Sequence, residues 1–541
     1  MKKFLSLILA LVMLTGILSA CSASGNNKNK DENNDKPKED NIDYLDVSGY
    51  TIVRSAASGD TVRNMTSVLK KSINDNVKLD LTVAMDDETE VECEILVGET
   101  NRKESVDALV ELKGKIKKEG YVIKVVGSKI VILGHTEDYT ALGVKQFINA
   151  FVSKSTKEKC LYLEKGDTTK FGKNGEVLYV SEIGSVVVLD KKSTVFKTDN
   201  YGDTHARSYA KIIKLEHQPD EKNNGILLAT NEFASPSPWP MYRSKDDGDT
   251  WENLKSIPDL VNGWFAGYQP YLFELPEDVG EYKKGTILFA ACTYNGSQTA
   301  IIMLCSTDLG ETWKSLGNVT IGGPNTNGVW EPVIAYENGR IYCFYSDEQD
   351  SFHNQRLIYK YTTDLKTWSE IGDMVTSGPN RPGMVALTKM GNGKWALAFE
   401  YWTSGQAGYP VRIMFADKLD SWKSISAGTQ VVSTTGVSLE SGPAMTWTPA
   451  GGGDGVLFLC AYKNINSKTD SRCDLFMSFD YGKTFVSIEN PLAVMKDAKH
   501  KCSYSPGFYT DKDGAVYYVN NPALVKGLNA GRVDMAKIMV Y

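Results

Sequence analysis

The chain has 541 residues, of which 60 are Lys or Arg and 67 are Asp or Glu, so its formal net charge is −7. This acidic balance argues against a nucleic acid or an anionic polymer as the main partner, because like charges repel. Only five histidines are present, and neither a Gly-x-Ser-x-Gly nor a His-Glu-x-x-His pattern occurs. Carboxylates are therefore the main candidates for acid–base chemistry.

The first residues predict export. A basic start is followed by an apolar stretch over residues 4–18, the arrangement of a secretory signal. Residues 18–21 read Leu-Ser-Ala-Cys and resemble a bacterial lipobox, which implies a signal peptide over residues 1–21 and lipidation of Cys21. An ordinary cleaved signal and a membrane-spanning helix are the alternatives. Residues 22–43 are almost entirely polar, so we expect a disordered tether that holds the protein on the extracellular face of the cytoplasmic membrane through its N-terminal lipid.

Eight further cysteines follow Cys21, at positions 93, 160, 292, 305, 343, 460, 473 and 502. An even number in an exported protein permits disulfides. Four of them, at 292, 305, 343 and 460, stand in apolar strand-like runs, where buried free thiols fit equally well. No Cys-x-x-Cys pair or Cys/His cluster has the spacing of metal ligands, so we expect no structural zinc.

Residues 44–165 predict a small α+β domain, because strand-like runs alternate with amphipathic segments. Strands are expected over residues 50–54, 79–83, 93–98, 121–126 and 129–133, and helices over residues 61–76, 105–118 and 139–152. The last two strands should form a hairpin across Gly127-Ser128. The run Ile95-Leu-Val-Gly-Glu-Thr-Asn101, followed by Gly120-Tyr-Val-Ile, resembles the accessory domain that precedes the catalytic domain of α-glucuronidases and hexosaminidases. This resemblance implies a packing or spacer role without chemistry.

A Ser/Thr-x-Asp-x-Gly-x-Thr-aromatic pattern recurs in the second part of the chain. Full copies occupy residues 244–251, 306–313 and 478–485, and a copy without the Gly occupies residues 362–368. In such a turn the Asp accepts backbone N–H groups, the Gly adopts positive φ, and the aromatic packs the turn onto a sheet. The pattern resembles the Asp box of sialidase-like β-propellers, where it is part of the scaffold and lies away from the chemistry.

The spacing of these copies predicts the number of blades. The first two start 62 residues apart, and the last two start 116 residues apart, which is twice 58. Repeats of about 60 residues suit four-stranded blades with long loops. A degenerate turn at residues 415–422 fills the gap where a copy is missing. We therefore predict a mainly β fold, in which a six-bladed β-propeller over residues 175–541 follows the small α+β domain.

Several carboxylates stand among aromatic residues at the ends of predicted strands. Glu331 lies between Trp330 and Pro332, Glu400 ends an apolar run, and Asp347 and Glu348 end another. Apolar neighbours raise the pKa of a carboxylic acid, and aromatic rings stack on sugars, so this combination suits glycosidic bond cleavage by a pair of carboxylates. For each one, a strand-end carboxylate bonded to backbone N–H groups is the alternative.

The stretch from Gly263 to Glu400 resembles glycoside hydrolase family 93, the exo-1,5-α-L-arabinanases. The similar segments are Tyr268–Pro276, Val329–Pro332, Phe344–Glu348, His353–Gln355, Arg381–Met384 and Phe399–Glu400. The resemblance implies an exo-acting retaining hydrolase with Glu331 and Glu400 as the catalytic pair, an oligosaccharide or polysaccharide substrate, and no cofactor. We favour Glu331 as acid/base and Glu400 as nucleophile. The residues expected to contact the sugar are Gln269, Asp347, Glu348 and Arg381 through polar groups, and Tyr268, Trp330, Trp402 and Tyr504 through their rings.

Two other functions remain open. Sialidases of the same clan bind their substrate carboxylate with three arginines, but Lys211 stands where the first is expected and offers no bidentate fork. Arginines that could compensate are Arg207, Arg356, Arg381, Arg412 and Arg472, and Tyr504 or Tyr509 could supply the tyrosine nucleophile. A propeller that binds glycans without cleaving them is the second alternative. It would not need two converging carboxylates.

Overall fold

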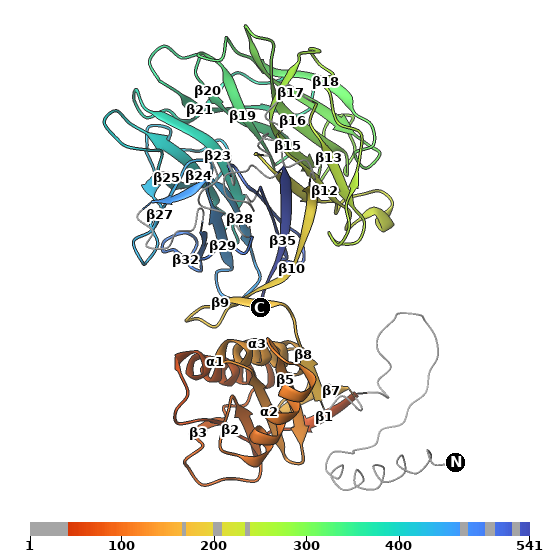
Figure 1. Cartoon of the computed structure of the whole chain (residues 1–541), viewed down its shortest axis with the longest axis vertical. Coiled ribbons are helices and arrows are strands. Elements are labelled where there is room, and N and C mark those ends of the chain that lie inside the picture. The colour runs from red at the N-terminus through yellow and green to blue at the C-terminus, as the bar shows by residue number, and fades with distance from the viewer. Residues whose placement is uncertain are drawn as a thin grey trace.

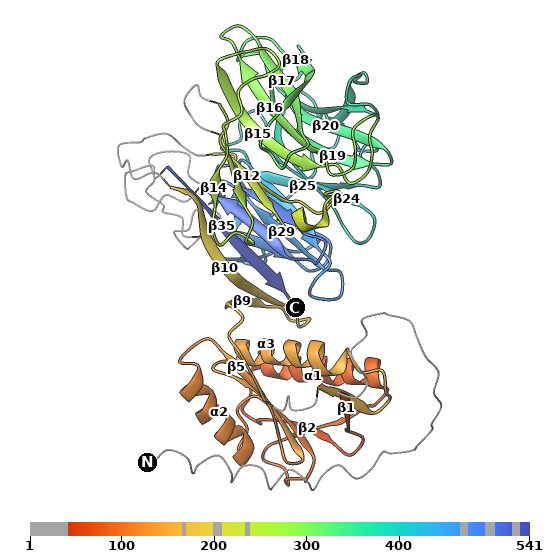
Figure 2. The same ribbon diagram turned by 90° about the vertical axis from the view of Figure 1, so that its right-hand side faces the viewer.

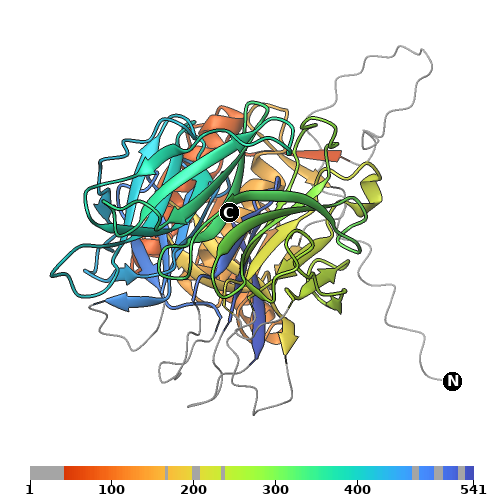
Figure 3. The same ribbon diagram turned by 90° about the horizontal axis from the view of Figure 1, so that it is seen from above.

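A computed structural model describes residues 42–164, 169–197, 208–232, 238–465, 474–492, 504–521 and 531–541. The chain forms a small α+β domain followed by a β-propeller, and the propeller lies above the small domain in Figure 1. Seen from above, the propeller overlies the small domain (Figure 3). Cys21 and the predicted tether as far as residue 41 lie outside the described residues. Within the described part of the chain, no helix has the length and apolar character needed to cross a membrane.

The small domain is built on a six-stranded mixed sheet. In spatial order its strands are β3 (Thr82–Met85), β2 (Thr51–Arg54), β4 (Glu94–Val97), β6 (Lys129–Gly134), β5 (Tyr121–Val126) and β8 (Thr169–Gly172). Its helices are α1 (Asp60–Val77), α2 (Lys103–Lys115) and α3 (Glu137–Phe147), the last continued by a π-helical turn (Ile148–Val152). Helices α1 and α3 pack on one face of the sheet and α2 packs on the other, as Figure 2 shows.

Most predicted elements of this domain are confirmed, including the hairpin of β5 and β6, but both domain boundaries move. A separate strand pair, β1 (Ile42–Asp46) with β7 (Cys160–Glu164), starts the domain at residue 42 rather than 44. The predicted end at residue 165 is wrong, because β8 pairs with β5 and extends the sheet to Gly172. A strand that completes a sheet edge contains few residues, so the sequence pattern there is weak.

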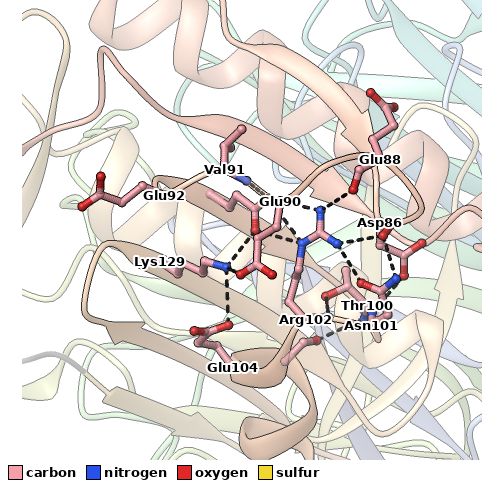
Figure 4. Close-up of polar contacts among 12 residues, drawn as sticks. Asp86, Glu88, Glu90, Val91, Glu92, Thr100, Asn101, Arg102, Glu104 and Lys129 are labelled. Carbon is pink, nitrogen blue, oxygen red and sulfur yellow. Dashed lines mark hydrogen bonds and ion pairs between the residues drawn. The ribbon is translucent and has the colours of Figure 1, made fainter.

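A buried group of charged side chains lies beside the start of α2 (Figure 4). The Arg102 side chain is 5% exposed and that of Glu94 is 1% exposed, and Arg102 Nε lies 3.2 Å from Glu94 Oε2. Lys129 Nζ lies 3.2 Å from the same oxygen, and Arg102 Nη1 donates to the carbonyl of Asp86 at 2.7 Å. The pKa of Glu94 is lowered, because the hydrogen bonds and charges of Arg102 and Lys129 outweigh the cost of its burial. This ion cluster therefore links α2 to the sheet, and the buried charge of Glu94 is balanced by Arg102 and Lys129.

The propeller has six blades in the described residues, as the repeat spacing predicts. The four-stranded blades are β11 (Lys211–Lys214), β12 (Leu227–Thr230), β13 (Met241–Ser244) and β14 (Glu252–Asn253); β15 (Ala266–Glu274), β16 (Ile287–Tyr294), β17 (Thr299–Ser306) and β18 (Lys314–Ile321); β19 (Val329–Glu337), β20 (Arg340–Asp347), β21 (Arg356–Thr362) and β22 (Gly372–Val375); β23 (Arg381–Lys389), β24 (Trp395–Trp402), β25 (Val411–Ala416) and β26 (Thr429–Gln430); and β28 (Ala444–Thr448), β29 (Val456–Cys460), β31 (Leu475–Ser478) and β32 (Val486–Ile488). The blades follow one another around the ring from yellow through green to blue in Figure 1.

The sixth blade combines distant parts of the chain. Its strands are β33 (Gly507–Thr510), β34 (Val516–Asn520) and β35 (Arg532–Val540), followed by β10 (Val186–Lys197) and β9 (Glu176–Val180). Antiparallel pairing of β10 with β35 closes the ring. Val186 and Val188 of β10 are buried in the same apolar cluster as α1 and α3, so the two domains share part of one core. A further strand pair, β27 (Ser438–Glu440) with β30 (Lys463–Ile465), and a 3₁₀ turn (Glu221–Asn223) complete the described elements.

The Asp-box turns have the geometry expected from their sequence. In the first, Gly248 has φ of +88° and its N–H donates to Ser244 Oγ at 2.8 Å, while Asp246 accepts from the N–H of Thr250 at 2.9 Å. The Trp251 indole donates to the Gly248 carbonyl at 3.2 Å. These turns join the third and fourth strands of their blades. The strand registers put them at the end of the blade opposite to Glu331.

The described cysteines include free thiols at Cys93, Cys292, Cys305 and Cys343. Three of these are buried in propeller strands, as apolar strand-like runs indicate. Cys473 and Cys502 lie outside the described residues, so the question of their pairing stays open.

Candidate active site

Each blade has a non-glycine residue in the left-handed conformation near the start of its innermost strand. These residues are Tyr209, Gln269, Glu331, Met384, Ser441 and Ser505, with φ between +51° and +64°. We call them the left-handed ring. In β15, β19 and β23 the position coincides with a bulge against the second strand. Such a conformation costs about 1–2 kcal/mol for a residue with a Cβ atom, so its repetition indicates a shared structural requirement.

The left-handed ring surrounds the propeller axis. A cavity of about 60 Å³ lies on this axis, because all six innermost strands line it, and five of the six ring residues contact it. A bulge turns side chains that would otherwise alternate across the sheet. The ring therefore brings the side chains of different blades together at one point.

Glu331 occupies the ring position of the third blade, and its carboxyl is held by residues of the first, third and fourth blades. Tyr209 Oη donates to Glu331 Oε1 at 3.0 Å, and Ser346 Oγ donates to Oε2 at 2.8 Å. The N–H of Met384 also donates to Oε2, at 3.1 Å. The N–H of Glu331 itself donates to Gln269 Oε1 at 3.0 Å. Both the backbone and the side chain of this glutamate are thus fixed.

The pKa of Glu331 is raised from 4.5 to about 7, first by burial and then by the negative charge of Glu400. Hydrogen bonds from Ser346 and Tyr209 and the positive charge of Arg381 oppose this rise without reversing it. Near neutral pH the carboxyl therefore exists in both forms. This property suits a group that gives and takes a proton.

Glu400 lies in a different environment, in β24 of the fourth blade. It is 4% exposed, and Ser441 Oγ and the N–H of Gly442 donate to its Oε2 at 2.7 and 3.2 Å. The guanidinium of Arg381 lies 3.3 Å from Oε1. A neighbouring cation and two donors stabilise the negative charge of a carboxylate. The two glutamates therefore lie in different electrostatic surroundings.

Strand β23 runs between the two glutamates. Gly383 pairs with Glu400 across the sheet, and the next residue, Met384, donates to Glu331. A Cβ atom on Gly383 would lie 3.1 Å from Glu400 Oε1 and 2.6 Å from Gln355 Nε2. The missing side chain thus leaves room for the carboxylate and for the buried amide beside it.

Comparisons with known proteins agree with the propeller fold. The family model described as "BNR repeat-like domain" matches residues 227–517, which is more than half of the chain. The chain belongs to this family. No curated protein sequence matches it significantly. Among solved structures, the Penicillium chrysogenum α-L-arabinanase complexed with arabinobiose is 29% identical, with a TM-score of 0.54, and the match covers 65% of this chain and 98% of that one.

A second solved structure is the α-L-arabinofuranosidase Arb93A from Fusarium graminearum in complex with an iminosugar inhibitor. It is 26% identical to this BNR repeat-like protein, with a TM-score of 0.54, and the match covers 65% of this chain and 98% of that one. A Fusarium graminearum α-L-arabinofuranosidase of family GH93 with bound arabinobiose matches at 26% identity and a TM-score of 0.53, over 64% of this chain and 97% of that one.

Four of the predicted sugar contacts lie together beside Glu400. Arg381 Nη2 lies 3.5 Å from Glu348 Oε1, and the Trp330 indole donates to Glu348 Oε2 at 3.0 Å. Trp402 pairs with Arg381 across the sheet and lies two residues from Glu400, so both side chains are on one strand face. Two rings, a cation and a carboxylate therefore lie close to Glu400.

Asp347 and Gln269 both have protein partners in the structure. Asp347 is 2% exposed and binds Arg356 Nε at 2.7 Å, which anchors the loop after β20. Gln269 lines the axial cavity, uses its Oε1 for Glu331 and directs its Nε2 toward the Tyr209 hydroxyl, 3.4 Å away. Sugar contact by either residue stays a prediction.

The two predicted tyrosines lie beside residues of the left-handed ring. The Tyr504 ring packs edge-on against Tyr209, with centroids 5.6 Å apart, and its hydroxyl lies 3.4 Å from Met384 Sδ. Tyr268 is half-buried and directly precedes Gln269 of the ring. Burial raises the pKa of both tyrosines, so they are neutral at physiological pH.

Sequence reasoning missed four residues of the site. Tyr209, Ser346 and Ser441 bind the two glutamates directly, and Glu232 Oε2 accepts the N–H of Gln269 at 3.0 Å. None of these four residues precedes a proline. Three ring residues do, before the prolines at positions 270, 332 and 506, and such a pair inside a strand indicates a bulge, so the sequence marks part of the ring without marking the four missed residues.

The arginines of a sialidase site are not assembled in the described residues. Lys211 donates to the carbonyls of Ser505 and Pro506 at 3.3 and 3.0 Å, and burial lowers its pKa to about 7. Arg412 binds the carbonyls of residues 427 and 428, and Arg356 binds Asp347. Arg207 and Arg472 lie outside the described residues. Tyr509 donates to Glu216 at 2.7 Å and lies on the wall of a lower axial cavity that does not include Glu331.

No group of three or more His, Cys, Asp or Glu side chains in the described residues has the arrangement of a metal site.

Proposed function

We propose that this protein is an exo-acting, retaining glycoside hydrolase that releases arabinose-containing products from α-L-arabinan. The observation that carries the proposal is the pair of glutamates, of which Glu331 has a raised pKa and Glu400 faces a guanidinium. The similarity to arabinanase and arabinofuranosidase structures at 26–29% identity supports the substrate class.

In the proposed first step, Glu400 attacks the anomeric carbon while Glu331 protonates the departing glycosidic oxygen. The bond to that oxygen breaks, and a covalent glycosyl–enzyme ester forms on Glu400. In the second step Glu331 takes a proton from water, the water oxygen attacks the anomeric carbon, and Glu400 leaves as a carboxylate. Retaining pairs stand about 5–5.5 Å apart, the separation expected here.

The surrounding residues support this division of roles. Arg381, Ser441 and Gly442 stabilise the charge of Glu400 before attack and after release. The rings of Trp330 and Trp402 are suited to stacking against a furanose ring and excluding water. Arg381 and Glu348 are suited to binding its hydroxyl groups.

The test uses the purified protein from residue 22 onward with linear 1,5-α-arabino-oligosaccharides and a sialyl aryl glycoside. We expect a short arabinose product from the first, and NMR of the reaction should show the α-anomer forming before mutarotation. A β-anomer would contradict the retaining mechanism. Sialic acid release would contradict the substrate class, and binding of arabino-oligosaccharide without any product would support the glycan-binding alternative.

We also propose that the protein acts at the extracellular face of the cytoplasmic membrane, held there by lipid on Cys21. The lipobox-like residues 18–21 support this. Labelled fatty acid should enter the wild-type protein and not the Cys21→Ala variant. Equal labelling of both would contradict lipidation.

A further inference from the structure

Tyr209 lies before the first strand of the first blade, yet its side chain contacts Glu331 of the third blade. It is a ring residue with φ of +52°, although it carries a large side chain, and its N–H donates to the Tyr504 carbonyl at 3.0 Å. The hydroxyl reaches across the axis to Glu331 Oε1, 122 residues later in the chain. A strained backbone that directs one hydroxyl at a catalytic carboxyl indicates a functional role.

Gln269 fixes the orientation of this hydroxyl. Its Oε1 accepts the N–H of Glu331, so its Nε2 must be the atom that faces Tyr209 Oη at 3.4 Å. The tyrosine oxygen thus receives one hydrogen bond from an amide that cannot turn over without losing its bond to Glu331. Its own proton and its second lone pair both remain for Glu331 Oε1.

The two oxygens of Glu331 differ in the partners they have. Oε2 faces the N–H of Met384, which can only donate, and the Ser346 hydroxyl. A proton on Oε2 would therefore meet a fixed donor. Oε1 faces only the Tyr209 hydroxyl among the described hydrogen bonds, and a hydroxyl can donate or accept. The acid proton consequently belongs on Oε1.

We propose that Tyr209 is the positioning residue of Glu331, donating its hydroxyl proton to the ionised carboxyl and accepting the Oε1 proton when the carboxyl is protonated. This role of Tyr209 rests on the proposed function in one respect, namely that Glu331 is the acid/base. The exchange moves no net charge, because the phenol stays neutral in both states, and burial raises the pKa of Tyr209 well above its ordinary value.

Other charged or titratable groups also face Glu331, so the effect of Tyr209 must be separated from theirs. They are Glu400 on β24, Arg381 on β23, Lys211 on β11, Glu232 after β12 and Tyr504 before β33. Glu400 raises the pKa of Glu331, and Arg381 lowers it. Tyr209 differs from these groups because it acts through one hydrogen bond, so exchanging its hydroxyl leaves the charges in place.

The test measures protonation of Glu331 without substrate, by infrared difference spectroscopy of the carboxyl band in the full protein. The spectrum of Glu331→Gln at each pH is the blank. The midpoint should rise by about one pH unit in Tyr209→Phe, because a hydrogen bond to a charged group contributes about 1.5 kcal/mol or more to its stability. Tyr504→Phe is the matched control, with an expected unchanged midpoint.

A second substitution guards against a folding defect in Tyr209→Phe. Incorporating 3-fluorotyrosine at position 209 keeps the ring packing and makes the hydroxyl a stronger donor, so the midpoint should fall. Equal midpoints in the wild type, Tyr209→Phe and the fluorinated protein would overturn the proposal. Because no substrate is present, this result is independent of whether arabinan is cleaved. With an active enzyme, the alkaline limb of kcat/KM should move with the same midpoint.

Discussion

Gly383→Ala tests whether the space beside the Glu400 carboxyl is as tight as the structure indicates. The new methyl group would lie 2.6 Å from Gln355 Nε2 and 3.1 Å from Glu400 Oε1. Gln355 is 1% exposed and donates to the Pro382 carbonyl at 2.7 Å, so its amide has little freedom to move away. Gly383 does not have positive φ, and alanine therefore adds no backbone strain.

Relief of this overlap requires a shift of Gln355 or Glu400 by several tenths of an ångström or more. A displacement of about 1 Å at a reacting group can lower the rate about 100-fold. Overpacking of a core typically costs about 1–3 kcal/mol in the free energy of unfolding. We therefore expect kcat on arabino-oligosaccharides to fall roughly 100-fold, with a modest fall in Tm.

Two comparisons make the experiment decisive. Gly114→Ala, on the exposed face of α2 where a Cβ atom meets nothing within 4 Å, should leave kcat unchanged. Gly383→Ala combined with Gln355→Ala removes the closest overlap and should recover part of the lost kcat. Wild-type kcat in Gly383→Ala alone would refute the described position of Glu400.

Four further predictions concern titration, activity and stability. With Glu331 as the acid and a pKa of about 7, kcat/KM should fall about tenfold for each pH unit above 7, and a profile that stays level to pH 9 would contradict this role. Because folding raises this pKa, the wild-type protein loses stability as pH rises from about 4.5 to 7 and the buried carboxyl ionises. The free energy of unfolding of Glu331→Gln, measured with denaturant, should therefore equal that of the wild type near pH 4 and exceed it by about 2–3 kcal/mol above pH 7. Equal free energies of unfolding at both pH values would exclude the shift. Glu331→Ala and Glu400→Ala should each lower kcat by about 100-fold or more while Tm stays near the wild-type value, and a large fall in Tm would instead indicate a structural role. In the small domain, Arg102→Met leaves Glu94 buried without its main partner and should cost about 3–5 kcal/mol, whereas a loss below 1 kcal/mol in urea unfolding would show that the ion cluster is not needed.

The sequence predicts the architecture well, because the architecture repeats. Asp-box spacing gives the blade count, since each turn depends only on residues within eight positions of one another. Glu331 and Glu400 are also recognisable, because aromatic and proline neighbours adjoin them in the chain.

Contacts between blades could not be predicted in this way. The Tyr209–Glu331 hydrogen bond joins residues 122 positions apart, and the Ser441–Glu400 bond joins residues 41 positions apart. The partner of Asp347 was equally hidden, since only the hairpin register places Arg356 opposite this strand-end carboxylate. The direction of a side chain at a bulge depends on tertiary structure, which local patterns do not record.

Closure of the ring by β10 and β35 has a consequence for synthesis. Joining segments more than 300 residues apart costs about 5 kcal/mol of chain entropy. Because synthesis proceeds at about 5–20 residues per second, β10 leaves the ribosome on the order of tens of seconds before β35. During this interval one edge of β10 is unpaired. The strand carries Asp190, Lys191 and Lys192 in its middle, next to a bulge, and charges of this kind discourage pairing with foreign strands. These charges thus protect the unpaired edge of β10 in the nascent chain until β35 is synthesised.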